Sequence, residues 1–171
     1  QLDAGAVGIA CQKTTEAAVF VEAGFNDIQI PYNVVGTAKT HRLAAMARHA
    51  TVTVTADSIP VIDGIASAAQ EAKVMINVMV ELVGPNERTG AAADQTVTLA
   101  QRILAADCLH FAGVMIYPST PDVRPRLQAA LQALADHDNL VETISGGSKI
   151  YGVRGDQVEQ GFEVAARGRV W

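Results

Sequence analysis

Short apolar runs alternate along this chain with longer stretches in which apolar residues recur every three or four positions. Short apolar runs are typical of buried strands, and a period near 3.6 residues is typical of helices. The pattern predicts strands over residues 6–11, 27–32, 51–56, 73–82, 109–117 and 140–144. It predicts helices over residues 15–23, 37–49, 59–72, 94–106 and 124–136. A chain of this kind is expected to fold as an α/β protein with a parallel sheet, because each helix returns the chain to the edge where the next strand begins.

Capping residues predict where two of these helices begin and end. Thr14 or Thr15 can cap the first helix, and Gly24 follows it as a stop signal. Ser58 can cap the third helix, which carries Pro60 in its first turn, where proline is tolerated.

Right-handed crossovers leave two arrangements for such a sheet, an open doubly wound sheet or a (β/α)8 TIM-type barrel. A doubly wound dinucleotide site needs a glycine fingerprint after its first strand, whereas Gln12-Lys-Thr-Thr-Glu16 stands there without glycine. We therefore predict a TIM-type barrel. It is expected to be incomplete, with about six to seven βα units, because a full barrel takes about 250 residues. Residues 1–148 are expected to form the barrel segment, and residues 149–171 an irregular C-terminal segment of the same domain with one strand near residues 162–166. We expect a further strand before Gln1 and another after Ser148.

Composition narrows the class of partner. The chain has 171 residues, of which 49% are hydrophobic, and this is enough for one substantial core. A net charge of −5 without a run of Lys or Arg argues against nucleic acid or an anionic membrane as a partner. No stretch approaches the roughly 20 apolar residues of a membrane span. Cys11 and Cys108 are interpreted as small buried residues, which predicts a cytoplasmic protein.

The strand ends carry the candidate chemistry, since barrel active sites are built at the C-terminal rim. Arg88 lies in a loop bounded by glycines and could present a fixed cation, although on its own it is more simply a solvated loop charge. Tyr117 ends a strand and could donate or accept a hydrogen bond, or simply be an amphipathic strand-end aromatic. Gln12 closes an apolar strand, where a polar side chain is costly unless it is paired. The other rim candidates are Lys13, Tyr32, Asn33, Asp57, Ser58 and Glu81, of which Asp57 and Ser58 are most simply a helix cap.

A glycine pair follows the last predicted strand, in the segment Ser145-Gly146-Gly147-Ser148. Consecutive glycines let backbone N–H groups converge on an anion, and the two serines add hydroxyl donors. The segment therefore predicts a phosphate nest, although Gly-Gly-Ser also occurs in ordinary loops. The four histidines lack metal-ligand spacing, so no metal site is predicted.

Several segments, in order, resemble one enzyme family. They are residues 1–9, Cys11-Gln-Lys-Thr-Thr-Glu-Ala17, residues 23–28, Asn33-Val-Val-Gly36, Glu87-Arg-Thr-Gly90, Gly113-Val-Met-Ile-Tyr117 and Ser145-Gly-Gly-Ser148. The resemblance is to the D-threonine aldolase and D-serine dehydratase group, which includes the 3-hydroxy-D-aspartate aldolases and has the alanine racemase type of barrel (fold-type III). It implies a pyridoxal 5'-phosphate (PLP) enzyme. It also implies that Gln12 and Arg88 lie near the phenolic oxygen of PLP, Tyr117 near its ring, and Ser145, Gly146, Gly147 and Ser148 around its phosphate.

The same resemblance shows where this chain departs from the family. The Schiff-base lysine of the family lies in a segment just upstream of the position of Gln1, and its second, β-rich domain and His-x-Cys metal pair have no counterpart here. A divalent metal is used in the family, but its ligands are absent from this sequence. The 81–88 segment and Ile116-Tyr-Pro-Ser119 also differ from the family's pattern. We expect that none of Lys13, Lys39, Lys73 and Lys149 takes the place of the Schiff-base lysine.

The resemblance implies a PLP-dependent lyase that acts on small D-β-hydroxy amino acids by aldol cleavage or dehydration, with its catalytic residues unassigned. Two alternatives stay open: a noncatalytic phosphate- or PLP-binding protein, and a truncated structural fragment of a racemase-like enzyme. A homodimer is also left open, and neither nucleic acid nor a membrane is expected as a partner.

Overall fold

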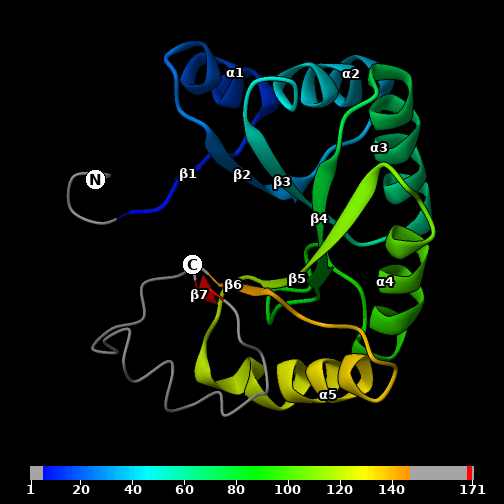
Figure 1. Ribbon diagram of the computed structural model, residues 1–171. Coiled ribbons are helices and arrows are strands. Elements are labelled where there is room, and N and C mark those ends of the chain that lie inside the picture. Colours follow the sequence, from blue (N-terminus) through cyan, green and yellow to red (C-terminus); the bar gives the residue numbers. More distant parts are fainter. Residues whose placement is uncertain (1–5, 147–168, 171) are drawn as a thin grey trace.

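The computed structural model describes residues 6–146 and 169–170, which form a curled parallel sheet with helices around its outside (Figure 1). The strands are β1 (Ile9–Ala10), β2 (Asp27–Asn33), β3 (Thr51–Ala56), β4 (Ile76–Leu82), β5 (Leu109–Ile116), β6 (Thr143–Gly146) and β7 (Arg169–Val170). The helices are α1 (Thr14–Glu22), α2 (Thr37–Met46), α3 (Ile59–Ala72), α4 (Thr96–Leu104) and α5 (Arg124–Ala135), with short 3₁₀ turns η2 (Ala93–Gln95) and η3 (Pro121–Val123).

The strand order decides between the two arrangements that the sequence allowed. Within the described part of the chain the order is β1-β2-β3-β4-β5-β6-β7, and every neighbouring pair is parallel. A doubly wound sheet reverses its strand order at a switch point, whereas a barrel adds each strand beside the previous one. The helices accordingly cover one face only, as Figure 1 shows. The fold is an α/β half-barrel, in agreement with the prediction of an incomplete TIM-type barrel.

One hydrogen bond demonstrates the curvature. Gln29 Nε2 on β2 donates to Ser145 Oγ on β6 over 2.8 Å, although the two strands are four places apart in the sheet. In a flat sheet with strands about 4.8 Å apart, these positions would be separated by roughly 19 Å. The sheet therefore bends far enough to bring the side chains of β2 and β6 together across its concave face.

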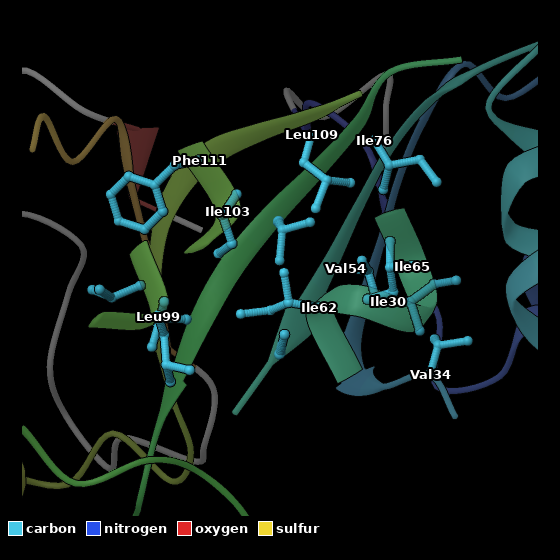
Figure 2. Close-up of a cluster of buried hydrophobic side chains, with 14 of the residues drawn as sticks. Ile30, Val34, Val54, Ile62, Ile65, Ile76, Leu99, Ile103, Leu109 and Phe111 are labelled. Atoms are coloured by element: carbon cyan, nitrogen blue, oxygen red, sulfur yellow. The ribbon is translucent and has the colours of Figure 1, made fainter. Parts of the chain in front are cut away.

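The apolar core fills the space between the convex face and the helices (Figure 2). Alternate residues of each strand point this way, such as Val54 on β3 and Ile76 on β4, and they meet Ile62 and Ile65 of α3. All four side chains are fully buried. Burying a side chain of this size stabilises the fold by about 1.5–3 kcal/mol, so this layer supplies most of the stability.

The intervening residues face the opposite way and are largely polar. In the part of the chain that the structure describes, a small apolar cluster, Met79, Ala112 and Met115, is separate from the main core. The polar positions in the same alternation are Gln29, Thr53, Thr55, Asn77, Glu81 and Ser145. The concave face therefore combines hydrogen-bonding groups with a few flexible methionines, which differs from the branched apolar filling usual in TIM barrels.

Three strands begin three residues later than predicted, and four strand ends shift by one or two residues. β1 is shorter than residues 6–11, because its register with β2 places Val7 opposite Asn26, which precedes that strand. β4 begins at Ile76 instead of 73, because Lys73 is the left-handed C-cap of α3 with φ 55°. β6 runs from Thr143 instead of 140, because pairing with β5 begins at Thr143.

The predicted caps also need correction. Lys13 is the N-cap of α1, and Thr14 is already helical, with its hydroxyl accepting from Arg42 Nη1 over 3.3 Å. Ser58 occupies the N-cap position of α3, but its side chain makes no capping bond. The Gly24 stop is confirmed, since α1 has its C-cap at Ala23. The expected strand near residues 162–166 lies outside the described residues, as do Gly147, Ser148 and Lys149. Among the described helices none has the length and apolar character to cross a bilayer.

Candidate functional site

A polar network connects the C-terminal ends of three neighbouring strands. Asn33 at the end of β2 donates through Nδ2 to Asp57 Oδ2 over 2.9 Å and to Glu81 Oε2 over 3.1 Å. The N–H of Asp57 donates back to Asn33 Oδ1 over 3.1 Å. Each polar atom of the Asn33 side chain is thus engaged, and one neutral amide links two carboxyl groups. Asp57, interpreted from the sequence as part of a helix cap, belongs instead to this network.

Glu81 is the buried member of the network, with 4% of its surface exposed. Its Oε1 accepts from Thr89 Oγ1 over 2.5 Å, and its Oε2 also accepts from Thr55 Oγ1 over 3.5 Å. Burial is the main cause that raises the pKa of Glu81, and the nearby Asp57 carboxyl raises it further. The Thr89 and Thr55 hydrogen bonds and the Arg88 cation act in the opposite direction without cancelling the rise.

The loop of residues 83–90 is tied to this network. Gly90 N donates to Asp57 Oδ2 over 3.1 Å, next to the Thr89 contact with Glu81. Gly90 has φ 107°, and a Cβ added there would lie 2.4 Å from the carbonyl carbon of Leu82, so only glycine fits without strain. The base of the loop is closed by Val83 N to Ala91 O (2.9 Å) and by Ala91 N to Glu81 O (2.8 Å). Arg126 of α5 also donates to Val83 O.

Arg88 projects from this loop to two tyrosine rings. Its guanidinium carbon lies 5.4 Å from the centre of the Tyr32 ring and 5.6 Å from that of Tyr117. Both distances lie within the range of cation–π attraction, which contributes about 0.5–1 kcal/mol at exposed sites. The structure therefore brings together Arg88 and Tyr117, two predicted site residues, and adds Tyr32. Arg88 is exposed, yet it is held more closely than a solvated loop charge would be.

Ser145 and Gly146 lie one strand further along the same rim. The Ser145 side chain is buried, and its hydroxyl accepts from Gln29 Nε2. A Cβ added to Gly146 would lie 2.9 Å from Ser119 Oγ, so the backbone of the last strand packs directly against a third serine. The described half of the predicted nest thus offers hydroxyl groups on both sides of a glycine.

Gln12 occupies a different environment from the one expected. Its side chain is exposed, and its backbone N–H donates to Glu16 Oε2 over 2.9 Å. Burial therefore forces no partner on this side chain. Its predicted place near the cofactor's phenolic oxygen stays a prediction.

Sequence reasoning missed four contributors, Gln29, Thr55, Thr89 and Ser119. Gln29 carried a signal, because it interrupts the apolar strand of residues 27–32 at an inward position. Thr89 and Ser119 carried none, since their roles depend on how loops return to the sheet. Among the described residues no group of three or more His, Cys, Asp or Glu side chains could hold a metal ion.

Comparisons with known proteins agree with the resemblance found in the sequence. D-threonine aldolase of Arthrobacter sp. is 39% identical over 118 residues, covering 68% of this chain and 31% of that protein. The 3-hydroxy-D-aspartate aldolase of Paracoccus denitrificans is 30% identical over 159 residues, covering 84% of this chain and 41% of that protein. The crystal structure of D-threonine aldolase from Filomicrobium marinum matches with a TM-score of 0.74 at 31% identity, covering 85% of this chain and 44% of that one.

This chain spans less than half the length of these relatives. A family model, "Alanine racemase, N-terminal domain", matches residues 1–150, and this match extends over most of the sequence. The chain belongs to the alanine racemase N-terminal domain family.

Proposed function

We propose that this chain forms the cofactor-binding wall of a PLP-dependent lyase that acts on small D-β-hydroxy amino acids. The observation that carries the proposal is the position of Arg88 between Tyr32 and Tyr117 at the strand ends, with the serines beside Gly146 further along the same rim. The relatives named D-threonine aldolase and 3-hydroxy-D-aspartate aldolase support the substrate class.

The described residues fit an anionic aromatic cofactor. PLP carries a phosphate and a phenolic oxygen, and these favour a cation and hydroxyl donors. Arg88 supplies the cation, while Ser145 and Ser119 supply hydroxyls beside Gly146, whose missing side chain lets Ser119 pack against its backbone. When bound, PLP supplies an electron sink for bond cleavage at an α-carbon.

The hydrogen bonding of Ser145 suggests how it would act. Its Oγ already accepts from Gln29 Nε2, and the hydroxyl keeps a hydrogen that it can donate. A hydroxyl donor held in this way suits a phosphate oxygen. Arg88 would carry the charge for the phenolic oxygen, and its contacts with the rings of Tyr32 and Tyr117 would hold the guanidinium at the rim.

The lysines among the described residues do not point to a covalent role. Lys13 is the N-cap of α1, Lys39 lies on α2, and Lys73 is the C-cap of α3, and all three are exposed. We assign these residues no part in holding the cofactor covalently. The same positions favour a second candidate function for the chain by itself, a noncatalytic PLP-binding protein.

A titration tests the proposal. PLP binding to the chain, followed by absorbance and by quenching of intrinsic fluorescence, should weaken about tenfold or more in Arg88→Ala, because the charge-assisted contact is lost. Arg48→Ala is the matched control, since Arg48 is an exposed arginine beyond the end of α2 and contacts Ala72 O. Equal affinities for the wild type and Arg88→Ala would refute the assignment of the site.

A further inference from the structure

We propose that Asn33, Asp57 and Glu81, here called the rim bridge, are positioning residues that hold the 83–90 loop so that Arg88 stays between the rings of Tyr32 and Tyr117. The positioning can be tested without a ligand. Its consequence for cofactor affinity rests on the proposed function.

The first step is that the rim bridge reaches the loop at two consecutive residues. Glu81 accepts from the Thr89 hydroxyl at 2.5 Å, and Asp57 accepts from the Gly90 N–H at 3.1 Å. Arg88 is the next residue toward the loop tip. Anchoring the two residues beside it fixes the direction in which the backbone of Arg88 leaves the sheet.

The second step is that the two anchors depend on each other through Asn33. Its Nδ2 donates to Asp57 Oδ2 and Glu81 Oε2, and its Oδ1 accepts from Asp57 N. The bridge thus takes one side chain from the end of β2, one from β4 and one from just after β3. The same β2 end also supplies Tyr32, one of the two rings against Arg88. Tyr32 and the three residues of the rim bridge therefore all lie at or just beyond the ends of the neighbouring strands β2, β3 and β4.

The third step concerns the rest of the loop, which has internal support of its own. Glu87 N donates to Gly84 O over 3.1 Å, which closes a turn at the tip, and Glu87 itself has φ 46°. Gly84 packs against the carbonyl of Tyr117, because a Cβ there would lie 2.0 Å from that oxygen. Arg88 is therefore supported from both directions along the loop. The turn that precedes it packs against Tyr117, and the two residues that follow it bind the rim bridge beside Tyr32.

Charge supports the same arrangement. The Arg88 cation lowers the pKa of Glu81, while Asp57 raises it, so both groups interact electrostatically with Glu81. Two carboxyl groups close together repel each other when both are ionised, and a nearby cation together with a shared amide reduces that repulsion. Removing the Arg88 cation should therefore change the stability of the rim bridge, and removing the rim bridge should change how firmly Arg88 is held.

Amide hydrogen exchange of residues 83–91 tests the positioning directly. Thr89→Val removes the hydroxyl but keeps the shape, and we expect about three- to tenfold faster exchange there, which corresponds to one lost hydrogen bond. Thr89→Ser keeps the hydroxyl and should retain the wild-type rate. Thr53→Val is the matched control, because Thr53 lies on β3 and its hydroxyl contacts Asn77 instead of the loop. An unchanged rate in Thr89→Val, or an equal rise in Thr53→Val, would overturn the proposal.

A double-mutant cycle with PLP tests the consequence. Thr89→Val should weaken PLP binding about three- to tenfold in the wild-type background and have no further effect in Arg88→Ala, because the threonine acts through the arginine. Losses that simply add would overturn the positioning role. If the wild-type chain does not bind PLP, the proposed function fails, and the exchange experiment still decides whether the rim bridge positions the loop.

Discussion

The two faces of the curled sheet are built from the same strands but differ in the character of their side chains. On the convex face, Val54, Ile76 and their neighbours pack against helices in a continuous apolar layer. On the concave face and its rim, Gln29, Glu81 and Ser145 are buried polar side chains, and Gln29 donates to Ser145 while Thr89 donates to Glu81. Parallel strands covered on both faces usually read as continuous apolar runs, so the polar alternation here distinguishes the concave face, on which we propose that the cofactor binds. Stability belongs mainly to the convex face, and the proposed chemistry to the concave one.

The largest effect should come from the convex face. Ile65→Ala removes a fully buried side chain between α3 and the sheet and should lower the free energy of unfolding by about 2–5 kcal/mol. Val19→Ala is the control, because Val19 is 64% exposed on α1 and should change stability by less than about 0.5 kcal/mol. Urea denaturation measures both. A loss below about 1 kcal/mol for Ile65→Ala would contradict the division between the faces.

A smaller effect is expected at the rim, from the glycine that anchors the Arg88 loop. Gly90→Ala places a Cβ at φ 107° against the backbone of Leu82 and should lower the free energy of unfolding by about 1–3 kcal/mol. Gly64→Ala is its matched control. Gly64 lies within α3 with open space around it, so alanine there should stabilise the fold by about 0.5–1 kcal/mol. Thermal unfolding of the two variants should therefore shift in opposite directions, and shifts of the same sign would contradict the close approach at Gly90.

More of the convex face than of the concave face could be predicted from the sequence. Apolar periodicity depends on local spacing, so it found all five helices and six of the seven strands in the described part of the chain, although three strands begin three residues later than predicted. It also placed Arg88 and Tyr117 on one rim, because parallel strand ends share an edge. It could not reveal that Asn33 links two carboxyl groups or that Thr89 binds Glu81. These contacts depend on the curvature of the sheet and on the path by which the 83–90 loop comes back to the strand ends. Lys73 was wrongly assigned to a strand because the apolar run that follows it is typical of a strand, whereas Lys73 is the left-handed C-cap of α3.

Glu81 offers a pH-dependent test of the rim. Its pKa is raised in the folded protein, mainly by burial, so Glu81 holds its proton more tightly when folded than when unfolded. Below its usual pKa near 4.5 both states are protonated. As pH rises from there through the raised value, the free energy of unfolding should fall. Glu81→Gln should remove this fall, so urea denaturation across that pH range should show the two curves separating with rising pH. A wild-type curve that rises relative to the variant would give the opposite sign and contradict the raised pKa.

The smallest effect is expected for covalent labelling by PLP, which should be nearly absent. This prediction tests whether any lysine of the chain can hold PLP covalently at the concave face. An amine that holds PLP covalently must lie at the site with a depressed pKa, so that free amine is present near neutral pH. Lys39 lies on an outward helix, Lys73 lies at the opposite rim, and Lys13 is exposed at the start of α1. Lys149, outside the described residues, follows the predicted nest, where it could at most neutralise phosphate. Borohydride reduction with PLP and peptide mapping should therefore find only scattered, substoichiometric labelling in this 171-residue chain, and aldolase and dehydratase turnover should be negligible. Stoichiometric labelling of Lys13 or Lys149 would contradict this and would give the chain a covalent catalyst of its own.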